Sequence, residues 1–215
     1  NLLPMDKEEY IATALTIREF THDRYFLFVT RKGMVKRTEI GLYKNVRSGG
    51  IRAVNLNDND ELLDVKEVPL NAEILLATEL GLGIRFSVGD VRPMGRSAAG
   101  VKGIALGGKD RVSSGVVFGD PDRTQVLTVS ANGFGKRTDV EHYRLQTRGG
   151  KGVINMKVTH KTGHVIGATS VNDTDELLLL TSANKIIRTQ VSQVRNVGRA
   201  AQGVTLVAMD EGTQV

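Results

Sequence analysis

The sequence of 215 residues predicts an all-β fold, a propeller-like array of about four four-stranded antiparallel blades with partial blades at both ends. Two sequence markers recur about every fifty residues, and that period suits a blade of about four strands. Turn signals within each repeat are spaced for short strands. Helical periodicity is scarce, whereas glycine is abundant, at 24 residues, and proline is rare, at 4.

The first marker is an apolar strand, a glycine or asparagine turn, and a short run that ends in arginine. Its four copies are Phe26–Thr38, Ile74–Phe86, Val126–Thr138 and Leu177–Thr189. The arginines of these copies, at steps of 48, 52 and 51 residues, are Arg37, Arg85, Arg137 and Arg188. Continuous apolar runs such as Tyr25–Val29 are typical of strands covered on both faces.

The second marker is an arginine, a turn of small residues, and a glycine that precedes a β-branched residue. Its four copies are Arg47–Ile51, Arg96–Val101, Arg148–Val153 and Arg199–Val204. The closing glycines of these copies are separated by 50, 52 and 51 residues. Because two independent markers keep the same period, we interpret the chain as an array of four repeats.

The markers divide the chain into repeats at about 25–71, 72–122, 123–174 and 175–215. Residues 1–24 are expected to be the tail of a preceding blade, because Asn1-Leu2 resembles Asn55-Leu56, which follows the second marker of the first repeat. Thr205-Leu206 occupies the same place in the last repeat. We therefore expect residues 1–215 to form a single domain that is a piece of a larger protein.

The composition favours a basic protein of a reducing compartment. Cysteine is absent, which fits a cytoplasmic location and excludes a disulfide framework. No apolar run approaches the roughly 20 residues that a membrane helix needs. The net charge is +5; residues 1–24 carry −2, so the remainder carries +7. Positive charge on a repeat array indicates an extended polyanionic partner.

The stretch Gln146–Gly152, which reads QTRGGKG, combines glycines with two cations. Glycine permits φ > 0 and the close approach of another backbone, and the cations suit a phosphate backbone that passes along a protein edge. A solvated β-turn is the alternative. The residues of this box-like turn are Gln146, Thr147, Arg148, Gly149, Gly150, Lys151 and Gly152.

Basic residues recur on both markers, and we expect them to contact phosphates. The candidates are Lys36, Arg37, Arg47, Arg52, Arg85, Arg96, Lys102, Lys136, Arg137, Arg148, Lys151, Lys185, Arg188 and Arg199. The arginines of the first marker should point outward along an arc, with the second repeat weakest because Ile84 replaces a lysine there. The alternative is that these arginines pair with carboxylates of a neighbouring blade.

An enzyme is the weakest functional interpretation of this stretch. The sequence offers no nucleophile–base pair, metal-ligand cluster or phosphate loop, so we expect no catalytic residue, metal or cofactor. His160 and His164 flank a Lys-Thr-Gly turn without a cysteine or an obvious carboxylate partner, which disfavours zinc. The four tyrosines are expected to be packing residues: Tyr10, Tyr25, Tyr43 and Tyr143.

The phrases GFGKRT, TRGGKGV, VGRAAQGV and GVKGIALG resemble the family of DNA gyrase A C-terminal domains, and the resemblance covers essentially the whole chain. It implies a β-pinwheel with strands exchanged between neighbouring blades and DNA wrapped around a basic rim. The family's box is Gln, basic, Arg, Gly, Gly, basic, Gly. Gln146–Gly152 matches it except at Thr147 and lies in a late repeat, which suggests a degenerate copy in a chain that starts near the third blade.

The resemblance also implies partners and a larger assembly. Double-stranded DNA would be the ligand, and the wrap would support negative supercoiling by an ATP-dependent type II topoisomerase whose catalytic tyrosine lies outside this stretch. The N-terminal domain of gyrase A and the gyrase B protein would complete an A2B2 assembly in the cytoplasm, associated with the nucleoid. Two alternatives stay open: the related domain of topoisomerase IV, and a protein-interaction propeller that binds an acidic partner.

Overall fold

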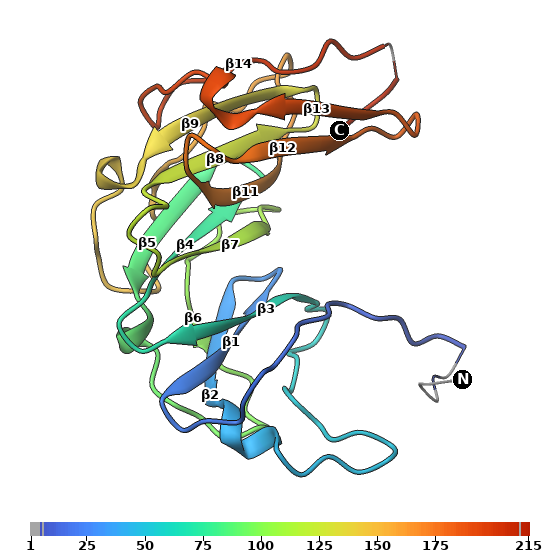
Figure 1. Cartoon of the computed structure of the whole chain (residues 1–215), viewed down its shortest axis with the longest axis vertical. Coiled ribbons are helices and arrows are strands. Elements are labelled where there is room, and N and C mark those ends of the chain that lie inside the picture. The colour runs from blue at the N-terminus through green and yellow to red at the C-terminus, as the bar shows by residue number, and fades with distance from the viewer. Residues whose placement is uncertain (1–4, 6, 211) are drawn as a thin grey trace.

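The structure, a computed structural model, describes residues 5, 7–210 and 212–215. Its regular elements are β-strands and four short 3-10 helices (Figure 1). The 3-10 helices are η1 (Ile40–Tyr43), η2 (Val88–Asp90), η3 (Val140–His142) and η4 (Val191–Gln193). The predicted all-β class is therefore confirmed.

Three four-stranded antiparallel sheets follow one another along the chain. The first, in the order β3-β1-β2-β6, contains β1 (Arg24–Thr30), β2 (Met34–Glu39), β3 (Leu62–Pro69) and β6 (Val101–Lys102). The second, in the order β10-β5-β4-β7, contains β4 (Glu73–Thr78), β5 (Leu82–Ser87), β7 (Val112–Phe118) and β10 (Val153–Ile154). The third, in the order β11-β8-β9-β14, contains β8 (Gln125–Ser130), β9 (Phe134–Asp139), β11 (Val165–Val171) and β14 (Val204–Thr205).

The fourth repeat contributes a two-stranded hairpin, formed by β12 (Glu176–Leu180) and β13 (Ile186–Gln190). Described residues ahead of β1 form no strand. The expected array of four-stranded blades is thus complete in three repeats and partial in the fourth, within the part of the chain that the structure describes.

Each complete sheet ends in a two-residue strand that belongs to the following repeat. Strand β6 pairs with β2 through Met34 and Lys102, and β10 and β14 pair with β5 and β9 in the same way. The exchange requires glycine where two backbones meet. Gly152 has a φ of +78°, and a Cβ there would collide with the carbonyl of Gly83. The closing glycine of the second marker therefore marks the crossing from one sheet to the next.

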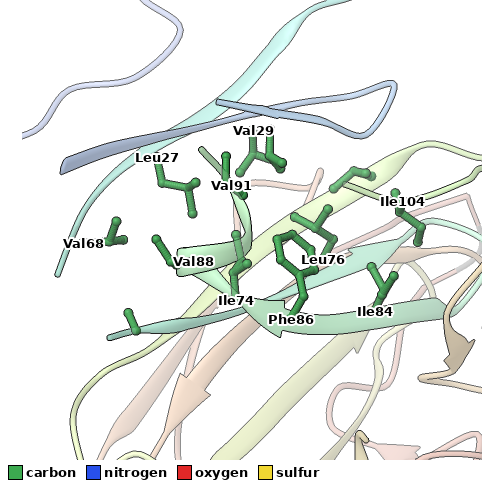
Figure 2. Packing of buried hydrophobic residues seen from close by; sticks show 13 residues of the cluster. Leu27, Val29, Val68, Ile74, Leu76, Ile84, Phe86, Val88, Val91 and Ile104 are labelled. Atoms are coloured by element: carbon green, nitrogen blue, oxygen red, sulfur yellow. The ribbon is translucent and has the colours of Figure 1, made fainter. Parts of the chain in front are cut away.

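The core lies between the faces of successive sheets. Figure 2 shows Leu27 and Val29 of β1 facing Ile74 and Leu76 of β4, with Phe86 of β5 beside them. A second cluster joins the third sheet to the terminal hairpin through residues such as Leu127 and Leu179. Continuous apolar strands are needed here because a central blade is covered on both faces.

The sheets form a curved array (Figure 1), and each exchanged strand lies at one end of its sheet. Strand β7 contacts both β3 and β11, so these three strands lie along the inner side of the curve. Strands β6, β10 and β14 stand at the opposite end of each sheet. Strand exchange therefore places the second marker of the second, third and fourth repeats on the outer side.

The predicted role of the tyrosines is confirmed for three of the four, and the first of these, Tyr25, packs half-buried against the first core cluster. Tyr43 and Tyr143 are buried, and the Tyr43 hydroxyl donates a 3.0 Å hydrogen bond to the carbonyl of Ala53. Burial raises the pKa of both phenols. The prediction is wrong for Tyr10, whose side chain is exposed because the segment before β1 lies outside the sheets.

Candidate nucleic-acid interface

Four segments around the second marker, one in each repeat, contain no aspartate or glutamate. We call residues 40–57, 91–109, 142–164 and 191–209 the rim segments. They carry three, four, five and two Lys and Arg residues, while all 24 acidic residues lie elsewhere. Every one of these cations is exposed or half-buried. Such segregation of charge is the electrostatic footprint of a polyanion-binding surface.

Backbone hydrogen bonds join the first three rim segments. The amide of Asn55 donates to the carbonyl of Ala98 at 3.3 Å, which links the first segment to the second. The amide of Gly149 donates to Gly103 at 2.6 Å, and that of Ala105 donates to Gly150 at 2.9 Å. The second-marker turns of neighbouring repeats are therefore held side by side.

The third and fourth rim segments are joined in the same manner. The amide of Lys157 donates to the carbonyl of Ala201 at 3.2 Å. The guanidinium of Arg199 donates to the carbonyl of Ile154 at 3.1 Å. All four rim segments thus form one continuous surface, which we call the rim.

A groove of about 870 Å³ lies between the first two rim segments. Arg47, Arg52 and Arg96 line it together with apolar, small and polar residues, and no acidic residue takes part. Arg47 and Arg52 are exposed, and Arg96 is half-buried. Three guanidinium groups around one open groove suit the oxygens of a phosphate chain.

The box-like turn lies on the rim. Arg148 donates to the carbonyls of Asp90 at 3.1 Å and Lys102 at 3.0 Å, so part of its donor capacity holds the turn against the preceding repeat. Lys151 is exposed on the same turn. Gly149 has a φ of +83°, which only glycine adopts without strain. The turn therefore presents the exposed ammonium of Lys151 and the guanidinium of Arg148, which also holds the turn against the preceding repeat.

Lys102 is exposed on β6 and completes the rim candidates of the second repeat. Several rim cations were not among the predicted contacts. They are Lys44, Arg92, Lys109, Arg144, Lys157, Lys161 and Arg195. These cations could have been identified from the sequence, because the segments around them contain no acidic residue.

The expected outward orientation is wrong for Arg37 and Arg137. They are 5% and 8% exposed, because they lie beneath the segment donated by the next repeat. Arg37 stacks on the ring of Tyr25, with its guanidinium carbon 4.6 Å from the ring centroid. Arg137 donates to carbonyls of Val194 and Ser192 and pairs with Asp173.

Arg85 is also held within the structure. Its Nη1 donates to the carbonyls of Val140 and Tyr143, both at 3.0 Å, and its Nε donates to Glu73 at 2.6 Å. The carbonyls belong to the η3 turn of the next repeat. Arg85 therefore joins two repeats, and its guanidinium is already occupied by structural partners.

Lys36 and Lys136 are buried as well. Lys36 Nζ donates to the carbonyl of Ala53 at 2.5 Å and to that of Arg96, and Lys136 Nζ donates to Thr138 at 2.7 Å and to Gly198 at 3.4 Å. Burial, together with a nearby arginine, lowers the pKa of each ammonium to about 8. These lysines face the turns of the rim from below.

Two candidates of the fourth repeat, Lys185 and Arg188, are exposed but ion-paired. Lys185 pairs with Asp210 at 2.9 Å, and Arg188 donates twice to Glu176, at 2.8 Å and 2.7 Å. Exposed pairs of this kind are weak and exchange readily with solvent or another anion. Arg188 occupies the place of Arg85 and Arg137, with its guanidinium open to solvent.

No group of three or more His, Cys, Asp or Glu side chains in the described part of the chain could hold a metal ion. No helix in that part is long and apolar enough to cross a membrane.

Comparison with known proteins gives a consistent result. A family model described as "DNA gyrase C-terminal domain, beta-propeller" matches residues 24–69, 72–118, 124–172 and 175–214. The DNA gyrase A protein of Lawsonia intracellularis is 54% identical over 216 residues, which cover 100% of this chain and 26% of that protein. The Haloquadratum walsbyi protein of the same name is 40% identical over 98% of this chain and 25% of its own length. The chain thus spans about a quarter of these curated relatives.

Two solved structures are similar over 99% of the chain. The C-terminal domain of DNA topoisomerase IV has a TM-score of 0.90 at 29% identity, and the match covers 67% of that chain. A DNA gyrase A C-terminal domain has a TM-score of 0.89 at 28% identity, and the match covers 71% of that chain. Both similarities extend over all four repeats.

Proposed function

The chain belongs to the DNA gyrase C-terminal domain family, and we propose that it binds duplex DNA along the rim, without sequence preference, and bends it. The observation that carries this proposal is the rim itself: four connected segments, rich in exposed Lys and Arg and free of carboxylates. A duplex presents two phosphate chains, and cations aligned along a surface neutralise them.

Contacts on the rim are expected to go to phosphates. The described residues form no α-helix that could enter the major groove, and the cations lie on turns and on two-residue strands. Phosphate contacts position a duplex but carry no direct sequence information. Binding should therefore depend on duplex length and salt concentration, and only weakly on base sequence.

The contact set that we propose differs from the sequence candidates. Arg47, Arg52, Arg96, Lys102, Arg148, Lys151 and Arg199 stay in it, together with the additional exposed rim cations. Lys36, Arg85, Lys136 and Arg137 act by holding the repeats together, and Arg37 is buried against Tyr25 of its own repeat. Lys185 and Arg188 lie in the terminal hairpin, outside the rim segments, and are secondary candidates.

Membership of this family also implies a role for the domain in a larger protein. In the intact protein this domain would act in a cytoplasmic, nucleoid-associated A2B2 assembly with the gyrase A N-terminal domain and gyrase B. It would wrap DNA so that strand passage introduces negative supercoils, with catalysis elsewhere. Topoisomerase IV is the alternative, because its C-terminal domain is as similar in fold as that of gyrase A.

Titration of the chain with duplexes of increasing length, at several salt concentrations, tests the proposal. If about six phosphates are neutralised, the log–log slope of the binding constant against salt should be about −5. Affinity should rise with length until the rim is covered. A slope near zero, or no preference for longer duplexes, would favour a surface that binds an acidic protein instead.

A further inference from the structure

The residue before the first-marker arginine alternates along the chain: it is Lys36, Ile84, Lys136 and Ile187 in successive repeats. The first three are buried beneath the second-marker turn of the next repeat, whereas Ile187 is half-buried. Strand register places the four at equivalent points, opposite Phe28, Leu76, Thr128 and Leu179. A lysine in a buried strand position is costly unless it has partners.

Each lysine donates one hydrogen bond within its own repeat, to Ala53 or Thr138, and another to the backbone at the second-marker turn of the next repeat. Lys36 Nζ donates to the carbonyl of Arg96, the first residue of the turn 96–100. Lys136 Nζ donates to the carbonyl of Gly198, directly before Arg199. The ammonium groups therefore hold the backbone that carries two arginines of the rim.

The second repeat provides the contrast. Ile84 lies beneath the turn 148–152, where a Cβ on Gly150 would be 3.6 Å from its Cδ1. That turn has its own exposed lysine, Lys151, whereas the turns above Lys36 and Lys136 read RSAAG and RAAQG and have none. These three turns thus have one lysine each, below the turn in two cases and on its surface in the third.

We propose that Lys36 and Lys136 are positioning residues that hold the Arg96 and Arg199 turns on the rim, and that their protonation is coupled to DNA binding. This inference rests on the proposed function. A charged ammonium donates hydrogen bonds roughly twice as strong as a neutral amine does. Phosphates arriving above the turn stabilise the charged form, so by linkage the charged form must bind DNA more tightly.

The groups that face these lysines allow them to titrate near neutral pH. Arg96 and Tyr43 surround Lys36, whose opposite residue on β1 is Phe28. Arg199 lies near Lys136, and Thr138 is its hydroxyl partner. Among the described residues, no carboxylate forms an ion pair with either ammonium. Burial and the arginines lower the pKa of both lysines to about 8.

The loss of DNA affinity that follows deprotonation of the two lysines can be distinguished from unfolding. The pKa of a lysine in an unfolded chain is about 10.4. The unfolded state therefore holds more protons between about pH 8 and 10.4, and these two lysines make the fold more stable as pH rises through that window. A merely structural role would move stability and DNA affinity in the same direction.

The test compares DNA affinity near pH 7 and near pH 9, at constant ionic strength, for the full chain and two variants. We expect the unmodified chain to lose up to about tenfold in affinity for each of the two lysines, because pH 9 lies about one unit above their pKa of about 8. The double variant Lys36→Met/Lys136→Met should lose most of this pH dependence. The control Lys151→Met should bind more weakly at both pH values and keep the pH dependence, because Lys151 is exposed and lies above Ile84.

A second measurement keeps the inference testable if the double variant does not fold. The binding enthalpy of the unmodified chain, measured near pH 8 in buffers of different ionisation enthalpy, should reveal proton uptake. No proton uptake, or equal pH dependence in the double variant, would overturn the inference while the DNA-binding function stands. No binding by any form near pH 7 would instead overturn the proposed function.

Discussion

The guanidinium Nε of Arg137 donates a hydrogen bond to the main-chain carbonyl of Val194, 2.7 Å away in the next repeat. Arg85 makes the equivalent contact with the carbonyl of Tyr143, through Nη1 at 3.0 Å. In each case the carbonyl lies just after a 3-10 turn, at its C-terminal end, where the peptide dipoles favour a cation. The first-marker arginines of the second and third repeats thus join each of these repeats to the next one.

Replacing Arg137 by methionine should therefore destabilise the fold. The change leaves the carbonyls of Val194 and Ser192 without their donor, at a cost of about 2–3 kcal/mol. The matched control is Arg188→Met, whose exposed pair with Glu176 contributes about 0–1 kcal/mol. Urea denaturation of both variants measures the difference. Equal losses of stability would contradict the role of Arg137 as a link between repeats.

Replacing Lys151 by alanine should weaken DNA binding without loss of stability. The side chain is exposed on the rim, so the stability should change by only about 0.5 kcal/mol. Losing one phosphate contact should reduce the salt slope by about 0.9. Lys66→Ala is the control, because Lys66 lies on the inner strand β3 and pairs with Asp64 at 2.8 Å. If both variants lost the same affinity, the rim would not be the DNA path.

Two glycines of the box-like turn should respond oppositely to alanine. Gly152→Ala should reduce stability by about 1–2 kcal/mol from its left-handed backbone alone, and by more because its Cβ meets the carbonyl of Gly83. Gly150 does not have a positive φ, and its nearest neighbours would be 3.6 Å and 3.7 Å from a Cβ. Gly150→Ala should melt close to the unmodified chain. Early melting of both variants would mean that the turn tolerates no side chain.

DNA bound along the whole rim should be bent. A duplex that touches the rim segments of four repeats on a curved array must follow the curve, and bending 20–30 base pairs by 40–90° costs on the order of 1–6 kcal/mol. The contacts of successive rim segments must offset this cost. Binding to nicked circular DNA, followed by ligation, should shift the linking number. An unchanged linking number at saturating protein would show binding without wrapping.

Much of the fold follows from patterns that are local in sequence. The hairpin of β1 and β2 is recognisable from the apolar run Tyr25–Val29, the Lys32-Gly33 turn and the polar exit at Lys36. Because every repeat uses the same turn chemistry, the period of about fifty residues predicts the succession of sheets. The exchanged strands are too short, at two residues each, to be identified from their own sequence.

The sequence by itself determined the all-β class, the repeat and the basic character of the turns, because apolar strands and glycine turns act within a few residues. The sequence could not show that the side chains of Arg137 and Arg148 differ in exposure, because both arginines stand in short runs with glycine and lysine. The tertiary structure decided that Arg137 is buried and that Arg148 lies on the rim. Strand exchange brings the carbonyls of Ser192 and Val194 into contact with Arg137. Whether a cation faces solvent depends on a segment more than fifty residues away, and no local pattern records that contact.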